Sequence, residues 1–112
     1  MKRAMLALIL VASTGAFAGD FHDRCDALES GARFVMETRQ SGMSMRKFVD
    51  TIRERRDAEP DDAAMQMLGT MYIKMASMAW KIPFFSTESI KQRAINDFAD
   101  DFYLACRKTR DE

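Results

Sequence analysis

Histidine and cysteine are scarce in this chain: His22 is the only histidine, and Cys25 and Cys106 are the only cysteines. A catalytic triad or a multi-histidine metal centre needs more imidazoles than one, so we interpret His22 as a surface side chain. The wide separation of the cysteines excludes a Cys-x-x-Cys redox site. We therefore predict a protein that is not an enzyme, with no catalytic residue, no cofactor and no metal site.

The chain also lacks a long basic run. Arg53, Arg55 and Arg56 form one cluster, but acidic residues follow it directly, from Asp57 to Asp62. Removal of Lys2 and Arg3 with a leader leaves all 17 acidic residues and gives a net charge of about −2. A surface that neutralises phosphates should instead carry a positive stripe, so we predict no binding to nucleic acid.

Long apolar runs are absent except near the N-terminus. Lys2 and Arg3 precede the apolar residues 4–12, and Ala16-Phe17-Ala18 has the small-x-small pattern of a signal-peptidase site. An apolar run this short does not span a bilayer of roughly 30 Å. We predict a cleavable signal peptide over residues 1–18 and a single domain over 19–112. We expect the protein to be exported to the periplasm or secreted, without a stable membrane span after cleavage.

Export sets the expected chemistry of the two cysteines. In an oxidising compartment, two cysteines and no third predict one structural disulfide, Cys25–Cys106. The two residues lie near opposite ends of the mature chain, so the bond would close nearly the whole domain.

Proline is also rare, and helical periodicity continues between the few breaks. Apolar residues recur at spacings of three and four, and no strand-like alternation interrupts them. Ser44, Asp61 or Asp62, and Ser86 or Thr87 are candidate N-caps. The pattern predicts an all-α fold, a small four-helix bundle closed by one disulfide. The expected helices cover about 21–40, 45–57, 62–81 and 87 onward.

Methionine, in contrast, is abundant: ten are present, and eight remain after the signal peptide. Thioethers fill irregular core gaps, suit adaptable binding surfaces, and are soft ligands for Cu(I). Met71, Met75 and Met78 follow i, i+4 and i+7 and share one helix face. The third predicted helix is apolar nearly all round, so it has more apolar surface than one buried stripe needs.

Asp97, Asp100 and Asp101 are the other chemical cluster in the sequence. Asp97 and Asp101 are one helical turn apart and could chelate a hard cation. Such carboxylates more commonly solubilise the outer face of a helix, and we assign them that role.

Several local features resemble a loose group of small exported helical proteins of bacteria and their phages. These are Cys25 before a helix ending in residues 39–42 (Arg-Gln-Ser-Gly), Pro83 before a capped helix, then Ala94-Ile95, Phe98, and Tyr103 with Cys106. The resemblance implies a secreted, disulfide-closed helical domain, and it transfers no activity and no site.

These observations favour a non-enzymatic periplasmic or secreted module that docks onto an envelope protein through a methionine- and aromatic-rich helical face. We expect Met75 and Trp80 to be exposed in that face. The alternatives are a Cu(I)-handling protein, an acid-stress-type periplasmic chaperone, and a phage lysis or exclusion regulator. The predicted partner-binding residues are Met67, Met71, Met75, Met78, Trp80, Phe84 and Phe85.

Overall fold

A computed structural model describes residues 21–111 of the chain, with side chains from 24 to 109. The predicted signal peptide, residues 1–18, lies outside the described residues, and so does the side chain of His22. Within residues 21–111 there are four helices and no strand. The predicted all-α fold class is confirmed.

The helices are α2 (Phe21–Gln40), α3 (Met45–Ala58), α4 (Ala63–Ala79) and α5 (Glu88–Asp111). Side-chain caps start two of them. The Ser44 hydroxyl accepts a hydrogen bond from the Lys47 N–H at 3.1 Å, and the Asp62 carboxylate accepts one from the Met65 N–H at 3.1 Å. These caps satisfy backbone donors that have no partner within the first turn of a helix.

Helix α4 ends at Ala79, two residues before the predicted end at Lys81. The Trp80 N–H still bonds back to the Ala76 carbonyl, at 3.0 Å. Ile82 precedes Pro83, and a residue before proline is disfavoured in the helical region, so the chain leaves the helix there.

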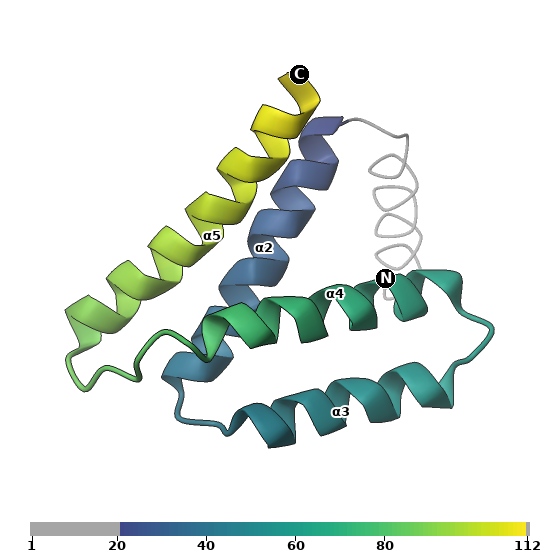
Figure 1. Cartoon of the computed structure of the whole chain (residues 1–112), viewed down its shortest axis with the longest axis horizontal. Coiled ribbons are helices and arrows are strands. Elements are labelled where there is room, and N and C mark those ends of the chain that lie inside the picture. Colours follow the sequence, from purple (N-terminus) through teal and green to yellow (C-terminus); the bar gives the residue numbers. More distant parts are fainter. Residues whose placement is uncertain (1–20, 112) are drawn as a thin grey trace, which may run out of the picture.

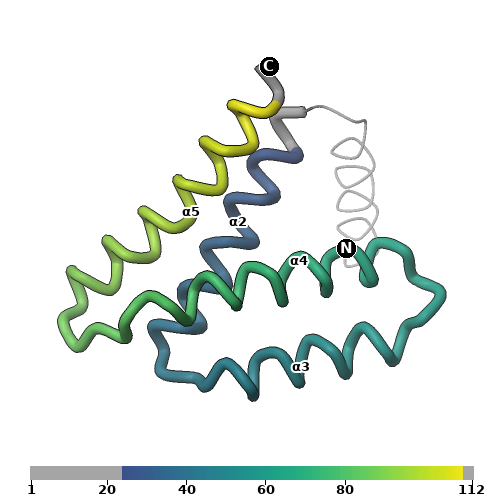
Figure 2. Tube along the Cα trace, viewed as in Figure 1, coloured from purple at the N-terminus to yellow at the C-terminus, as the bar shows by residue number. Residues whose placement is uncertain are grey.

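The four helices form two antiparallel pairs that cross each other. Helices α2 and α5 lie side by side along their length, and the α3–α4 hairpin crosses the lower part of α2 (Figure 1). The tube in Figure 2 shows the same antiparallel course of α2 and α5, with the α3–α4 hairpin across them. Helix α2 is therefore the central element, in contact with both α5 and α4.

The core lies where α2 meets the other three helices. Its members are alanine, methionine and β-branched side chains, with one aromatic residue from α3 and one from α5. The buried cluster consists of Ala32, Val35, Met36, Phe48, Met75, Ala76, Ala79, Ile95 and Phe98.

Two glycines mark close contacts between the helices. A Cβ added at Gly31 of α2 would lie 3.2 Å from Cε1 of the Tyr72 ring, and one added at Gly69 of α4 would lie 3.1 Å from Cδ of Arg56. A ring packed in an interface moves less readily than the long side chain of an arginine. Alanine should therefore be tolerated less well at Gly31 than at Gly69.

The predicted disulfide is confirmed. Cys25 and Cys106 are bonded, with their Cα atoms 5.5 Å apart, and Cys25 is fully buried. The bond joins the first turns of α2 to the last turns of α5. It therefore fixes the free end of the α2–α5 pair.

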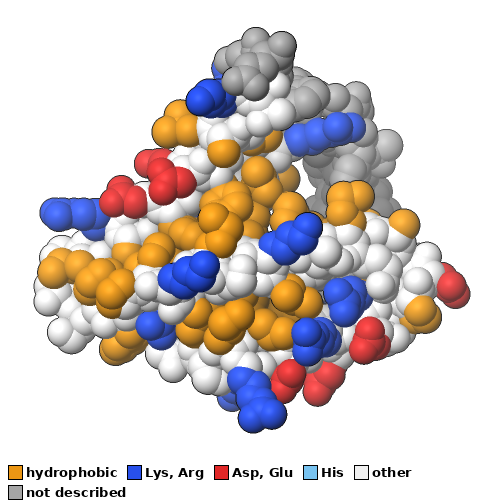
Figure 3. Space-filling model, in the orientation of Figure 1, with side chains coloured by type: hydrophobic (Ala, Val, Ile, Leu, Met, Phe, Trp, Pro, Cys, Tyr) orange, Lys and Arg blue, Asp and Glu red, His pale blue; other side chains and the backbone are white. Residues whose placement is uncertain are grey.

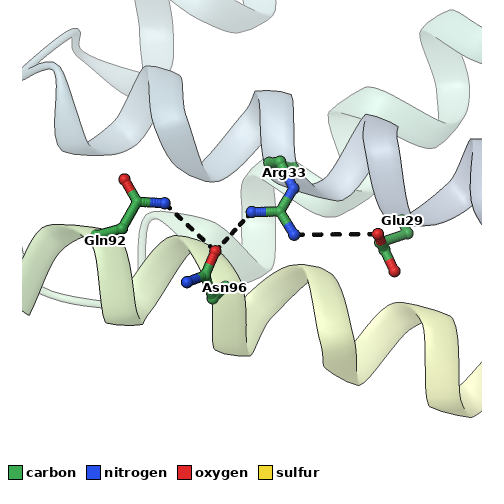
Figure 4. A network of polar contacts seen from close by, with 4 residues as sticks. All are labelled: Glu29, Arg33, Gln92 and Asn96. Carbon is green, nitrogen blue, oxygen red and sulfur yellow. Dashed lines mark hydrogen bonds and ion pairs between the residues drawn. The ribbon is translucent and has the colours of Figure 1, made fainter.

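Polar side chains hold the middle of the same pair. The Arg33 guanidinium of α2 donates to the Asn96 side-chain oxygen of α5 at 2.6 Å, and Gln92 donates to the same oxygen at 3.3 Å (Figure 4). The Glu29 carboxylate lies 3.9 Å from the Arg33 guanidinium one turn away. Because these groups are solvent-accessible, the network fixes register more than it adds stability.

No helix within residues 21–111 has the length and apolarity needed to cross a membrane.

Candidate interaction surface

Three of the predicted binding residues form one exposed stripe on α4. Met67 is 69% exposed, Met78 is 50% exposed, and Met71 is half-buried. Their spacings of four and seven residues place them on one side of the helix, opposite the buried Gly69 and Ala76. We call Met67, Met71 and Met78 the methionine stripe.

Two other predicted residues do not belong to this surface. Met75 is only 1% exposed and packs in the core, so the expectation that it is exposed was wrong. Trp80 is half-buried: its ring stacks on Phe48 at a centroid distance of 5.4 Å, and its indole N–H donates to the Met43 carbonyl at 3.1 Å. Both side chains contribute to packing between helices.

The two predicted phenylalanines lie on the connector between α4 and α5. Phe84 is 48% exposed, and the Lys91 ammonium lies 4.4 Å from the centroid of its ring. Phe85 is half-buried, and its backbone N–H donates to the Gln40 side-chain oxygen at 3.0 Å. The structure therefore brings the predicted residues to separate places instead of one continuous face.

Gln40, which sequence reasoning did not single out, holds this connector. Its side chain is buried at 3% exposure and donates to the Pro83 carbonyl at 2.8 Å, besides accepting from Phe85. Its backbone carbonyl accepts from the Lys91 ammonium at 3.1 Å. A glutamine at a helix end gives no sign in the sequence that it will be buried by a segment more than 40 residues later.

The connector and α5 together line a second apolar surface that sequence reasoning also missed. It is an open groove of about 260 Å³. Its floor is built from apolar side chains of the connector and of one side of α5, and its rim is charged. The floor residues are Ile82, Phe85, Ile90, Ala94 and Phe98, and the rim residues are Arg93, Asp97 and Asp101. We call this surface the α5 groove.

The space-filling view shows where apolar and charged side chains gather on one face of the molecule (Figure 3). Apolar side chains are exposed over α4 and toward its junction with α5, and acidic side chains gather on α5 beside them (Figure 3). Along α3, basic and acidic side chains are mixed. Most of the exposed large apolar side chains among residues 24–109 belong to α4 or α5: Met67, Leu68, Met78, Ile90 and Leu104.

The described residues offer no obvious centre for metal or thiol chemistry. Within residues 21–111, no group of three or more His, Cys, Asp or Glu side chains is arranged to hold a metal ion. Cys25 and Cys106 are both consumed by the disulfide. The unusual part of the surface of residues 24–109 is its exposed apolar area, which is bordered by charged side chains.

For the methionine stripe and the α5 groove, known proteins provide no precedent. No protein-family model, no curated protein and no solved structure matches the chain.

Proposed function

We propose that this chain is an exported, non-enzymatic interaction module that docks onto an envelope protein through the methionine stripe. The observation that carries the proposal is the alignment of Met67, Met71 and Met78 on the solvent side of α4. The proposal assigns no catalytic residue and no cofactor.

The composition of that helix face supports docking. The outer face of a helix in a small soluble domain is normally polar, whereas on α4 three methionines share that face with Thr70 and Lys74. Unbranched thioethers change rotamer easily and are polarisable, so they fit a partner's apolar side chains without a preformed pocket. The aliphatic part of Lys74 can lie along the same contact while its ammonium stays in water.

Export to the periplasm is supported by two independent features. The disulfide is the kind of bond that persists in an oxidising compartment. Residues 1–18 have the pattern of a signal peptide.

The test is site-specific photo-crosslinking in living cells. A photoreactive phenylalanine analogue replaces Met67 or Met78 in separate strains, and Thr51, an exposed residue of α3, in the control. We expect one discrete adduct from the two α4 positions and none from position 51. Many adducts of different mass from α4 would favour a general chaperone, and no adduct would refute docking through the stripe.

A pair of substitutions separates docking from Cu(I) binding. Replacing Met67 and Met71 with leucine keeps the stripe apolar but removes two thioethers, so docking should persist and any Cu(I) binding should be lost. With the photoreactive residue moved to position 71, replacing Met67 and Met78 with aspartate should abolish the adduct and retain wild-type α-helical content, because both side chains are exposed. The leucine variant is tested with the photoreactive residue at position 78. If the leucine variant lost the partner and the aspartate variant kept it, the proposal would be wrong.

A further inference from the structure

We infer that the α5 groove is a second binding site, and that its occupant is an amphipathic basic helix of another protein. The juxtaposition that carries this inference is an apolar floor contributed by the connector and α5 beside carboxylates on the same side of α5. The site is separate from the methionine stripe and does not depend on the function proposed for it.

The size of the groove argues for a macromolecular ligand. It is an open groove of about 260 Å³, whereas a small-molecule site encloses most of its ligand's surface. It is open along one side and has room for one or two apolar side chains. Leu104, at 62% exposure, extends the apolar surface along α5 beyond it. An elongated partner lying along α5 would cover all of this surface.

The charges on α5 select the sign of that partner. Between residues 94 and 106, the only charged side chains of the helix are Asp97, Asp100 and Asp101, and all three are exposed. Among residues 24–109 none of the three takes part in an ion pair. Their charges are therefore available to an incoming cationic group.

The same charges argue against phosphate-bearing ligands. Nucleic acids and anionic lipid surfaces are attracted by clustered lysine and arginine, and the carboxylates of α5 would repel them. A protein segment that carries lysine or arginine beside apolar residues is the class that matches both floor and rim.

The spacing of the rim indicates a helical partner and the order of charges along it. Arg93, Asp97 and Asp101 are each four residues apart, so they follow one another along one edge of α5. A helix packed alongside presents its own side chains with the same repeat, because four residues of an α-helix rise about 6 Å. The complementary order is an acidic residue opposite Arg93, followed by basic residues opposite Asp97 and Asp101.

The test uses the purified disulfide-bonded protein and a fluorescein-labelled, 15-residue helical peptide of leucine and lysine as the probe. Fluorescence anisotropy should show saturable binding that weakens between 50 and 300 mM salt. Exchange of Asp97 and Asp101 for asparagine should raise the Kd by about tenfold, since two exposed charge pairs are lost without a change in side-chain shape.

Matched controls make the result specific to the groove. Exchange of Asp50 and Asp57 of α3, which are also exposed acids, for asparagine should change the Kd by less than twofold. A peptide with glutamate in place of lysine should not bind. Absence of saturable binding, an unchanged Kd for the Asp97 and Asp101 variant, or an equal loss in the α3 control would each overturn the inference.

One further pair of measurements keeps the two sites distinguishable. The aspartate variant of Met67 and Met78 should bind the leucine–lysine peptide with the wild-type Kd. The asparagine variant of Asp97 and Asp101 should still form the adduct from position 67. Loss of peptide binding in the stripe variant would show that the probe reports on the stripe and would overturn the assignment to the groove.

Discussion

Replacing Gln40 with leucine should loosen the connector between α4 and α5. The substitution removes the donor to the Pro83 carbonyl, at 2.8 Å, and the acceptor for the Phe85 N–H, at 3.0 Å. A hydrogen bond of this kind contributes about 1 kcal/mol net, and a buried group left without its partner costs roughly 1–3 kcal/mol. The two backbone groups are only partly buried, so the lower end applies to each, and we expect about 2 kcal/mol of lost stability in total.

Urea unfolding followed by circular dichroism measures that loss, and amide hydrogen exchange at Phe85 locates it. The matched control is Gln92→Leu, which removes an exposed glutamine whose single side-chain bond, to Asn96, is 3.3 Å long. The control should change the free energy of unfolding by no more than ~0.5 kcal/mol. If Gln40→Leu lost no more stability than the control, or if the Phe85 amide exchanged at the wild-type rate, the conclusion that Gln40 holds the connector would be refuted.

Two further predictions concern stability. Replacing both Cys25 and Cys106 with alanine releases a loop defined by a sequence separation of 81, and the chain-entropy relation gives a loss of about 4.5 kcal/mol. Denaturant unfolding should show it, and a loss below about 1 kcal/mol would contradict the entropic account. Gly69→Ala should stabilise by about 0.5 kcal/mol, because alanine favours the helix and only a flexible arginine must move. Gly31→Ala should destabilise by about 1 kcal/mol or more, since its Cβ meets the Tyr72 ring. Thermal unfolding compares the two variants, and a higher melting temperature for Gly31→Ala than for Gly69→Ala would contradict both predictions.

Local signals made the helices predictable from the sequence. The Ser44 cap and the Pro83 break act within a few residues of their positions, so their effects need no knowledge of the tertiary structure. The cysteine pair was predictable for a different reason, because only one intramolecular pairing of two cysteines exists. In each case the physical cause lies in the chain itself.

The direction in which α4 faces was not predictable in the same way. Met71, Met75 and Met78 share a side, but a helix that is apolar nearly all round does not reveal which part of that side is covered. Contact with α2 buries Met75 completely and leaves Met78 half exposed. The outcome is decided by packing between helices that lie far apart in the sequence.

The α5 groove was missed for a related reason. Ile82 and Phe85 become part of its floor because Arg39 and Gln40 hold the connector against the end of α2, through hydrogen bonds to the Ile82 and Pro83 carbonyls. The burial of Gln40 and the formation of the groove are two results of the same long-range contact. Neither can be predicted from the apolar periodicity of each helix taken alone.

The position of α2 at the centre also affects the order in which the protein can mature. A chain is made from its N-terminus, so the α3–α4 hairpin, whose contacts are local, can form while α5 is still missing. The apolar side of α2 that faces Ile95 and Phe98 stays uncovered until the last helix, Glu88–Asp111, has emerged. Cys25 likewise has no partner until residue 106 is present. A prematurely terminated product would expose that side of α2 and a free thiol, so the oxidised, protease-resistant form would consist of full-length molecules alone.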